Sequence, residues 1–443
     1  MLLLSFIIVI AGCSNQSSNN SESDSSSNVE YSGSALEAAM EGKFKGTTVT
    51  VLGPFSSPDE EKFKETLRSF EEQTGIDVKY EFAPDIATSL QIRVDGGNAP
   101  DIVGFAQPGV LYDFAKKGHI IDVSEFLSKD YLESQYSESW IDMVTVEGPD
   151  GEEMIAGVWQ RANAKSLVWY PKKAFEQAGY EIPTTWEELM ALTVQIANDG
   201  YTPWAIGIES GQATGWPATD WVEEIMLRTT SLENYDKWVT GELPFTSPEV
   251  KKAVEIMSEI WLNEDYVYGG ANSISTTNFG DSVKELFTNP PNAFLHKQGN
   301  FITSFFPEGV TEEEYDFFYL PPIDEQYGKP VLVGGDIMAM MNDRPEVRAV
   351  MEYFTKGESL KTWIQSGGAI SPHQDSDLNW YTNNIERKVA EIILNADSVR
   401  FDGSDLMPAS VGTGTFWTGM TNYIGGQTTL EEALEEIQSG FEQ

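Results

Sequence analysis

The sequence predicts an α/β protein with at least two lobes, on three observations. Its 443 residues are too many for one hydrophobic core. Hydrophobic residues make up 40% and charged residues 22%, the balance of an ordinary globular protein. Short β-branched segments alternate with amphipathic segments, at a spacing that indicates a parallel sheet covered by helices.

The first 120 residues carry this alternation most clearly. Thr47–Leu52 is a short β-branched run, typical of a buried strand. Ser57 and Pro58, followed by acidic residues, begin a helix whose apolar positions recur until Gly75. The same reasoning predicts strands at Ile76–Phe82 and Asp101–Phe105, and helices at Ile86–Val94 and Val110–Lys117.

Two loops of this region are candidates for a ligand site. In open α/β sheets, ligands bind in the crevice beyond the carboxyl ends of the parallel strands. Gly53–Ser57 and Gln107–Gly109 follow two of the predicted strands directly. We therefore expect both loops to face a bound ligand.

The rest of the chain is predicted to contain more helices than strands. Helices begin at a cap or proline in Thr185–Asn198, Trp216–Thr229 and Pro248–Glu264. Gly269–Phe279 is a polar, Gly/Ser-rich loop, and the pattern after Pro345 is mainly helical, interrupted by Asp402–Gly419. Further strands are expected at Lys165–Tyr170, Ala293–Leu295, Phe317–Leu320 and Val331–Met341.

The N-terminus is predicted to be a lipoprotein signal followed by a tether. Met1–Ala11 is almost continuously apolar, too short to span a bilayer as a helix but typical of a secretory signal. Ile10-Ala11-Gly12-Cys13 resembles a bacterial lipobox, which implies signal residues 1–13 and acylation of Cys13. Residues 14–45 begin with a Ser/Asn-rich stretch and are predicted to be a flexible tether.

Charge limits the possible partners. The formal net charge is −42. So acidic a surface repels phosphate backbones and anionic lipid, which excludes a nucleic-acid partner and favours a neutral or cationic ligand. The membrane is then contacted only through the lipid anchor, at the extracellular face of the cytoplasmic membrane.

The sequence contains no convincing catalytic or metal-binding pattern. Its three histidines have no metal-ligand spacing, and Cys13 is the only cysteine. No phosphate-binding or dinucleotide-binding loop occurs, so no cofactor and no metal are expected. Asp402 and Asp405 with Glu209 or Asp220 would supply a carboxylate pair for glycoside hydrolysis. With 70 acidic residues such a pair is weak evidence, and an enzyme is not expected.

Aromatic residues point to a sugar ligand. The chain has 12 Trp, 17 Tyr and 23 Phe. A sugar ring stacks its apolar face on an aromatic plane, and its hydroxyl rim needs side chains such as Asp, Glu, Asn, Gln and Arg. The loop-like segments Glu209–Trp221 and Arg400–Trp417 supply both kinds of side chain.

Seven segments resemble the family 1 extracellular solute-binding proteins of carbohydrate ABC importers, in particular the α-glucoside-binding branch. They are GTTVTVLGPF, RVDGGNAPDIVGFAQPG, KSLVWYPKKAF, PWAIGIESGQATGWPATDW, NAFLHKQGNF, VGGDIMAMM and RFDGSDLMPASVGTGTFWTGM, the last being typical of the narrower branch. The resemblance covers about Gly46 to Met420.

The resemblance implies a periplasmic-binding-protein fold of the maltodextrin-binding type, with two α/β lobes joined by a three-crossing hinge. Carried onto this sequence, the crossings fall near Gln160–Lys165, Ser275–Asn292 and Leu332–Asp336. The N-lobe would then be 46–160 plus 293–332, and the C-lobe 161–292 plus 333–443. Closure of the lobes would hide the ligand from water.

Site residues follow from the same resemblance. Phe55, Ser56 and Gln107 are expected on the N-lobe wall, with Gly335 and Asp336 at the hinge. The C-lobe residues expected in the site are Glu209, Trp216, Asp220, Trp221, Arg400, Asp402, Asp405, Phe416 and Trp417. For Arg400 and Asp405, a structural ion pair is the alternative.

The implied ligand is a small neutral α-glucoside of the trehalose, sucrose, maltose or glucosylglycerol type. The implied partners are the transmembrane subunits of an ABC permease, and the protein is expected to be a monomer. One rival is a receptor for a betaine-type compatible solute, which requires an aromatic cage around a quaternary ammonium group. The other rival is the secreted glycoside hydrolase.

Overall fold

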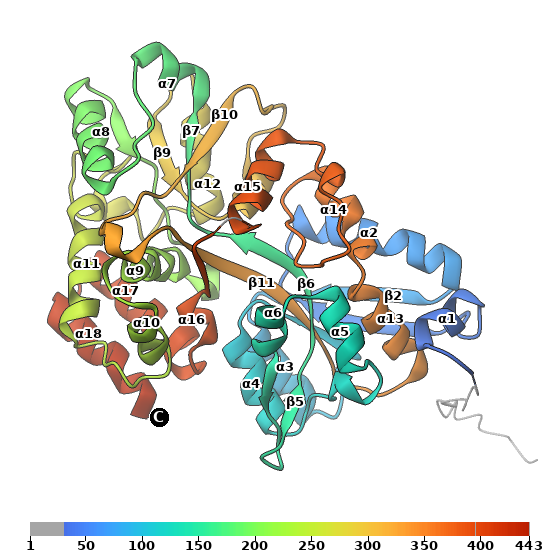
Figure 1. Ribbon diagram of the computed structural model, residues 1–443. Helices are drawn as coiled ribbons and strands as arrows, with labels where there is room; N and C mark the ends of the chain where they lie inside the picture. The colour runs from blue at the N-terminus through green and yellow to red at the C-terminus, as the bar shows by residue number, and fades with distance from the viewer. Residues whose placement is uncertain (1–30, 395, 443) are drawn as a thin grey trace, which may run out of the picture.

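The computed structural model describes residues 31–394 and 396–442 and shows two α/β lobes (Figure 1). The N-lobe is built on a six-stranded sheet in the order β12-β11-β3-β1-β2, with β6 paired to β11. Its strands are β1 (Thr48–Gly53), β2 (Asp77–Phe82), β3 (Ile102–Phe105), β6 (Val158–Ala164), β11 (Pro330–Met340) and β12 (Ser398–Phe401). β1 pairs in parallel with both β2 and β3, so the parallel sheet predicted for this region is confirmed.

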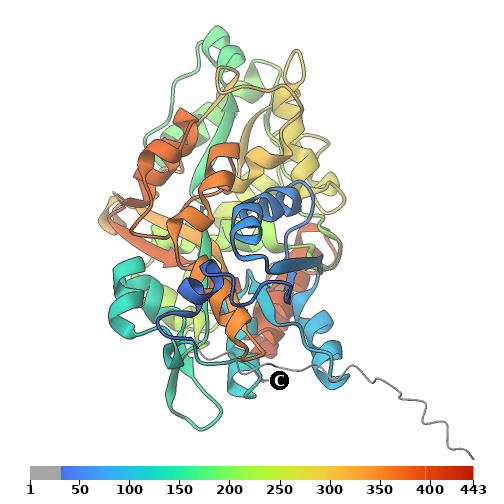
Figure 2. The ribbon, with the colours of Figure 1, turned by 90° about the vertical axis from the view of Figure 1, so that its right-hand side faces the viewer.

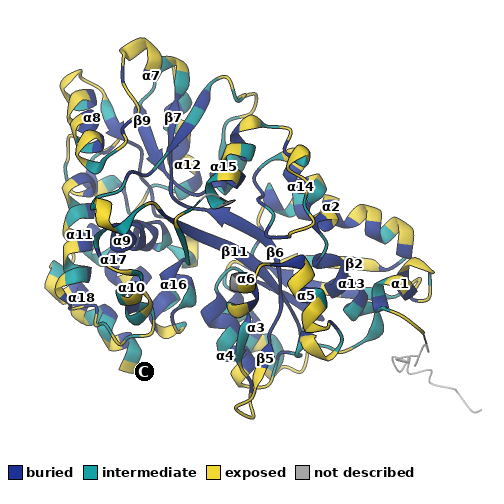
Figure 3. Cartoon of the chain, in the orientation of Figure 1, coloured by how far each residue is buried: buried dark blue, intermediate teal, exposed yellow. Residues whose placement is uncertain are grey.

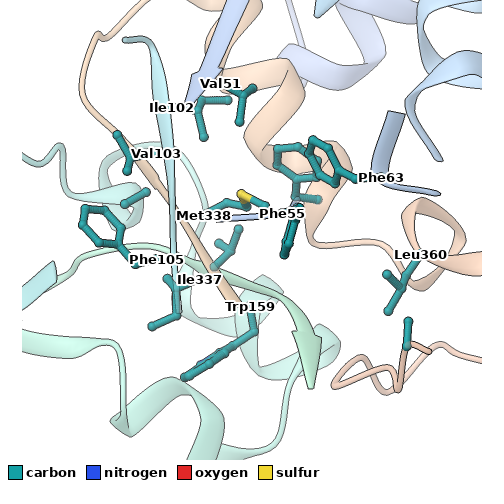
Figure 4. Packing of buried hydrophobic residues seen from close by; sticks show 14 of the residues in the cluster. Val51, Phe55, Phe63, Ile102, Val103, Phe105, Trp159, Ile337, Met338 and Leu360 are labelled. Atoms are coloured by element: carbon teal, nitrogen blue, oxygen red, sulfur yellow. The ribbon is translucent and has the colours of Figure 1, made fainter. Parts of the chain in front are cut away.

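The local sequence explains helix α2 (Asp59–Thr74), which packs on the N-lobe sheet. In α2, Phe63, Leu67 and Phe70 recur at helical spacing and are buried. Figure 4 shows Phe63 and Phe55 packed near Val51 and Met338 of the sheet. The other helices of this lobe are α1 (Ala35–Met40), α3 (Ile86–Asp95), α4 (Pro108–Lys116), α5 (Lys129–Gln135), α6 (Glu138–Asp142), α13 (Pro345–Phe354) and α14 (Lys361–Ser366), and a small hairpin consists of β4 (Thr145–Glu147) and β5 (Glu153–Ile155).

The C-lobe is built on a four-stranded sheet in the order β10-β7-β9-β8. Its strands are β7 (Leu167–Pro171), β8 (Thr202–Trp204), β9 (Ala293–Lys297) and β10 (Tyr315–Tyr319). Its helices are α7 (Lys172–Ala178), α8 (Trp186–Asn198), α9 (Trp216–Thr229), α10 (Leu232–Val239), α11 (Pro248–Trp261), α12 (Phe279–Ser282), α16 (Gly403–Leu406), α17 (Trp417–Ile424) and α18 (Leu430–Ser439).

The chain passes between the sheets at three places. It leaves β6 for β7 at Lys165-Ser166, returns from β10 to β11 through 320–329, and leaves β12 for α16 at Asp402. Every residue of β6 and β11 is buried, and Figure 3 shows both strands running through the junction. The fold is therefore the two-lobed α/β type that the resemblance implied.

The expected lobe boundaries need correction. The segment 293–332 was assigned to the N-lobe, but β9 pairs with β7 and β8, and β10 pairs with β7, so both strands belong to the C-lobe. The segment 333–443 was assigned to the C-lobe, but α13 packs on α1 and α14 packs on α2. The crossing expected near Ser275–Asn292 is absent from the described chain, and the true last crossing follows β12.

The tether expected over 14–45 also ends earlier than predicted. Residues 35–40 form α1, which begins with a reciprocal capping interaction between Ser34 and Glu37. Ala35, Ala38 and Ala39 are buried against α13, on the lobe that faces the viewer in Figure 2. Residues 14–30, the signal segment and Cys13 lie outside the described residues.

No helix within residues 31–394 and 396–442 combines the length and apolar character needed to cross a bilayer.

α15 (Asn384–Leu394) lies at the junction of the two lobes. It packs against β6 of the N-lobe, and Lys388 pairs with Asp316 of β10 at 3.0 Å. Glu386, at the start of this helix, is buried and accepts a hydrogen bond from the Gly368 amide.

Candidate functional site

A cavity of about 470 Å³ lies where the two lobes meet. The carboxyl ends of β1, β2 and β3 line it with Pro54–Ser56 after β1, Phe82 at the end of β2 and Ala106–Gln107 after β3. The junction strands contribute Arg161, Asn163, Lys165 and Gly334–Asp336. The C-lobe contributes Ser210, Gln212, Ala213, Trp216, Asn278, Phe279, Phe301, Phe305, Asp402, Asp405, Thr413 and Trp417.

Four aromatic rings form one side of this cavity, and we call them the aromatic wall: Trp216, Phe279, Phe301 and Phe305. The Trp216 ring centre lies 5.1 Å from that of Phe279 and 5.8 Å from that of Phe301. Phe279 and Phe305 are 5.0 Å apart. Phe301 and Phe305 belong to the 3-10 helix Asn300–Phe305, which follows β9.

A glycine makes room for one of these rings. A Cβ atom at Gly299 would lie 2.4 Å from the Phe301 ring, so any larger residue there displaces the ring.

Two buried cations hold the junction beside the aromatic wall. The Arg161 guanidinium donates to Asp59 and to Asp336, both at 2.8 Å, and lies over the rings of Phe55 and Trp363. Burial opposes the charge of Arg161, but the carboxylates of Asp336 and Asp59 outweigh it and raise the pKa of the guanidinium. Arg161 thereby joins β6, β11 and α2.

Lys165 is the second cation and lies in a group of carboxylates. Its Nζ is 3.0 Å from Asp220 Oδ1 and 4.0 Å from Asp405 Oδ2, and it donates a short hydrogen bond to Asp402. Its Nζ also lies 5.6 Å from the centre of the Trp216 ring. Burial opposes the lysine charge, but Asp220 and Asp402 overcome it and raise the pKa of Lys165 well above its ordinary value.

The carboxyl groups around Lys165 differ in their pKa values. Burial raises the pKa of Asp220 to about 7. Burial and the neighbouring Asp402 raise the pKa of Asp405 well above its ordinary range. Asp402 is also buried, but Lys165 and hydrogen bonds hold its pKa below the ordinary value.

This carboxylate group is already used by the fold. Among the described residues, Asp220, Glu223 and Asp402 are close enough together to hold a metal ion. Lys165 pairs with two of them, and Glu223 accepts hydrogen bonds from the Gly403 and Ser404 amides at 3.0 Å. The ammonium group of Lys165 therefore supplies the positive charge that these acids need.

Several polar groups on the cavity wall retain bonding capacity. Asn163 Oδ1 and Trp417 Nε1 have no hydrogen-bond partner among the described residues. Gln107, from the opposite lobe, lines the same cavity as Asp405 and slightly offsets the rise in the pKa of that carboxyl. The two oxygens of a carboxyl group can take part in several hydrogen bonds, so Asp405 has room for further partners.

The structure brings nine of the expected site residues to the cavity wall: Phe55, Ser56, Gln107, Trp216, Gly335, Asp336, Asp402, Asp405 and Trp417. It places Asp220 behind the wall, where it holds Lys165. Glu209 is also displaced from the wall: it accepts hydrogen bonds from Asn278 and the Gly211 amide, both at 2.8 Å, and supports the loop that carries Asn278.

Three expected site residues lie elsewhere, and these assignments are corrected. Trp221 is buried among Trp204 and Trp261 in the C-lobe core. Phe416 packs on Trp238 and Phe245. Arg400 makes a two-pronged ion pair with Asp236 near the surface, so its partner is not Asp405. All three side chains are of types that can bind a sugar. Whether they point into the cavity depends on the packing of α9, α10 and β12.

Sequence reasoning missed Arg161, Asn163, Lys165, Phe279, Phe301 and Phe305. The sequence did contain a signal for Arg161, Asn163 and Lys165. They belong to the run Gln160–Lys165, where polar and charged residues interrupt an otherwise apolar part of the chain. Charged groups are almost never fully buried unless they are paired. A buried strand with two cations therefore indicates carboxylate partners, although it does not identify them.

Two α/β lobes with an aromatic and carboxylate-lined cavity between them define a two-lobed solute-binding protein. Residues 52–359 match the family model described as bacterial extracellular solute-binding protein, and the chain belongs to this family. It is an extracellular solute-binding protein of an ABC transporter and not an enzyme.

Two curated relatives are similar over most of the chain. The osmoprotective compounds-binding protein GgtB of Synechocystis sp. is 48% identical over 378 residues, which is 85% of this chain and 89% of the relative. The alpha-glucosides-binding periplasmic protein AglE of Rhizobium meliloti is 42% identical over 409 residues, 91% of this chain and 89% of the relative.

Solved structures show the same fold at low sequence identity. A chitin oligosaccharide binding protein superposes with a TM-score of 0.75 at 17% identity, covering 89% of this chain and 98% of that one. Maltose-bound MalE3 of T. maritima gives a TM-score of 0.68 at 16% identity, covering 90% and 99%.

Proposed function

We propose that this protein captures a small neutral α-glucoside of the trehalose, sucrose, maltose or glucosylglycerol type. The lobes close around the sugar and present it to the transmembrane subunits of an ABC permease. The observation that carries the proposal is that one cavity combines the aromatic wall with the polar side chains of Gln107 and Asp405, which come from opposite lobes. The name of AglE, an alpha-glucosides-binding protein, supports the same ligand class.

The chemistry of the cavity suits a sugar. The aromatic wall offers flat apolar surface to the C–H face of a pyranose ring. Asp405, Gln107 and Asn163 supply donors and acceptors to the hydroxyl rim. Stacking together with several charge-assisted hydrogen bonds is consistent with micromolar affinity, about −8 kcal/mol.

Calorimetric titration with trehalose, sucrose, maltose and glucosylglycerol tests the proposal. We expect Asp405→Ala to weaken binding by about 1–3 kcal/mol, because sugar hydroxyls are left without a partner in a closed site. The matched control is Asp236→Ala, because Asp236 lies near the surface and pairs with Arg400 away from the cavity. Unchanged affinity in Asp405→Ala, together with a lower melting temperature, assigns Asp405 a structural role instead.

A betaine-type solute is the second candidate. The aromatic wall faces carboxylates, an arrangement that also attracts a quaternary ammonium group. Competition decides between the two: glycine betaine that displaces a bound α-glucoside, or binds where no sugar does, overturns the sugar assignment.

The membrane attachment is a separate part of the proposal. The lipobox-like Ile10-Ala11-Gly12-Cys13 supports acylation of Cys13, which would become the mature N-terminus of a membrane-anchored monomer. Mass spectrometry of the protein extracted from native membranes should find a lipid-modified N-terminal cysteine. An unmodified Cys13 in the exported protein contradicts this attachment.

A further inference from the structure

The two lobes touch at one point where their backbones leave no room for a side chain. α4 of the N-lobe begins at Pro108 and lies beside α16 of the C-lobe (Figure 1). A Cβ atom at Gly109 would lie 2.0 Å from the carbonyl oxygen of Met407 and 3.0 Å from that of Leu406. Because both neighbours are backbone atoms, only separation of the two segments would accommodate a methyl group there.

A polar contact between the lobes lies beside this point. Gln107, two residues before Gly109, faces the same cavity as Asp405, two residues before Met407, and is near enough to affect the pKa of that carboxyl. Both side chains line the cavity, whereas Gly109 and Met407 do not. The pair of segments Gln107–Gly109 and Asp405–Met407 therefore joins a group that faces the ligand to a backbone contact just outside the cavity.

This contact differs from the permanent connections between the lobes. Arg161 lies on β6 and Lys165 directly follows it at the first chain crossing, and both pair with groups of neighbouring strands and helices. Gln107–Gly109 lies at the start of α4 and Asp405–Met407 at the end of α16, which contact each other, and neither segment is part of a strand. A rotation of the lobes about the crossings can separate these segments without breaking a strand.

We propose that Gly109 and Met407 form the closing contact of the cleft, and that Gly109 is required for the ligand-bound state but not for folding. The inference rests on the proposed function, in which the lobes close around a sugar. A methyl group at position 109 has space while the lobes are apart and obstructs their approach. The substitution therefore acts on the closed state alone.

The test compares Gly109→Ala with the wild-type protein in two measurements. Calorimetry with the α-glucosides should show affinity lowered about tenfold or more, the range expected from overpacking a tight contact. Small-angle scattering should show a smaller ligand-induced contraction than in the wild type. The melting temperature without ligand should equal that of the wild type.

The control variant is Gly96→Ala, at the end of α3, where a Cβ atom meets no atom closer than 3.2 Å. It should leave both the affinity and the contraction unchanged. A lower ligand-free melting temperature in Gly109→Ala with unchanged affinity overturns the proposal, because the contact is then a permanent part of the fold.

The proposed function can fail independently of this contact. A wild-type protein that binds none of the α-glucosides contradicts the ligand assignment. The melting temperature without ligand then tests the closing contact alone: equal values in Gly109→Ala and wild type support it, and a clear drop in the variant overturns it.

Discussion

Lys165 Nζ lies 3.0 Å from Asp220 Oδ1 of α9, and this ion pair ties the first chain crossing to a helix of the C-lobe. Lys165 is at the first crossing, and its side chain also reaches Asp402, at the third. Its stem lies against Gly334 in β11, which the second crossing enters, so closely that a Cβ atom at Gly334 would be 2.9 Å from Lys165 Cε. Lys165 therefore links the first crossing to α9, to β11 and to the third crossing.

Replacing Lys165 with Met should destabilise the protein strongly. The change leaves Asp220 and Asp402 buried without their cation, and breaking a buried pair in this way typically costs about 3–5 kcal/mol. Urea denaturation followed by tryptophan fluorescence measures the loss. Lys388→Met, which breaks the more exposed pair with Asp316, is the control and should cost less than about 1 kcal/mol. Equal effects of the two substitutions contradict the role of Lys165.

Two tryptophans of α9 should respond differently to truncation. Trp216 is on the cavity wall, whereas Trp221 is 2% exposed and lies in the C-lobe core. We expect Trp216→Ala to lower α-glucoside affinity at least about tenfold with a small change in stability. Trp221→Ala should cost about 3–5 kcal/mol of folding free energy, because it leaves a cavity in the core.

Calorimetry and thermal melting on both tryptophan variants check this prediction. The reverse pattern, with affinity lost on truncation of Trp221 and stability lost on truncation of Trp216, shows that the aromatic wall is not the sugar-stacking surface.

Glu386 should make stability fall as the pH rises. Burial raises the pKa of this carboxyl to about 7 from an ordinary 4.5, despite the amide of Gly368 and the nearby Lys62. Between these values the folded protein holds a proton that the unfolded chain has released, so folding is favoured at low pH. The associated stability, about 3 kcal/mol, is present below pH 4.5 and is lost as the pH rises to about 7.

The isosteric variant Glu386→Gln replaces the titrating carboxyl group with an amide that stays neutral at every pH. Its stability relative to the wild type should increase by up to about 3 kcal/mol between pH 5 and pH 8, measured by denaturation at each pH. Lys62, Asp59 and Thr303, which surround the carboxyl, are the same in both proteins. A constant difference across this range means that Glu386 does not titrate there.

Salt should stabilise the fold. With a net charge of −42 the folded protein repels itself, and the repulsion acts over about 10 Å at 0.1 M salt but only about 3 Å at 1 M. The melting temperature should therefore rise from low to molar KCl, a salt that strengthens apolar burial only weakly. A melting temperature that stays constant or falls contradicts this prediction.

The closing contact at Gly109 could not be anticipated from sequence, although its neighbourhood could. The loop that begins at Gln107 is placed at the end of a parallel strand by local pattern alone. The distance from Gly109 to Met407 depends on how α16 is held by Asp402 and Glu223, which come from separate parts of the chain. Side-chain identity does not encode a close approach of two backbones.

The sequence by itself determined the two-lobed α/β class, the parallel strands of the N-lobe and the absence of a convincing catalytic pattern. The lobe number depends on chain length, the strands on local periodicity, capping and turn residues, and the last on motif spacing, and all of these can be read along the chain. Only the tertiary structure decided that β9 and β10 belong to the C-lobe, that Trp221 and Phe416 are core residues and that Arg400 pairs with Asp236. Such choices depend on contacts between distant segments: Lys165 and Asp402 are 237 residues apart, and only the folded chain can bring them together.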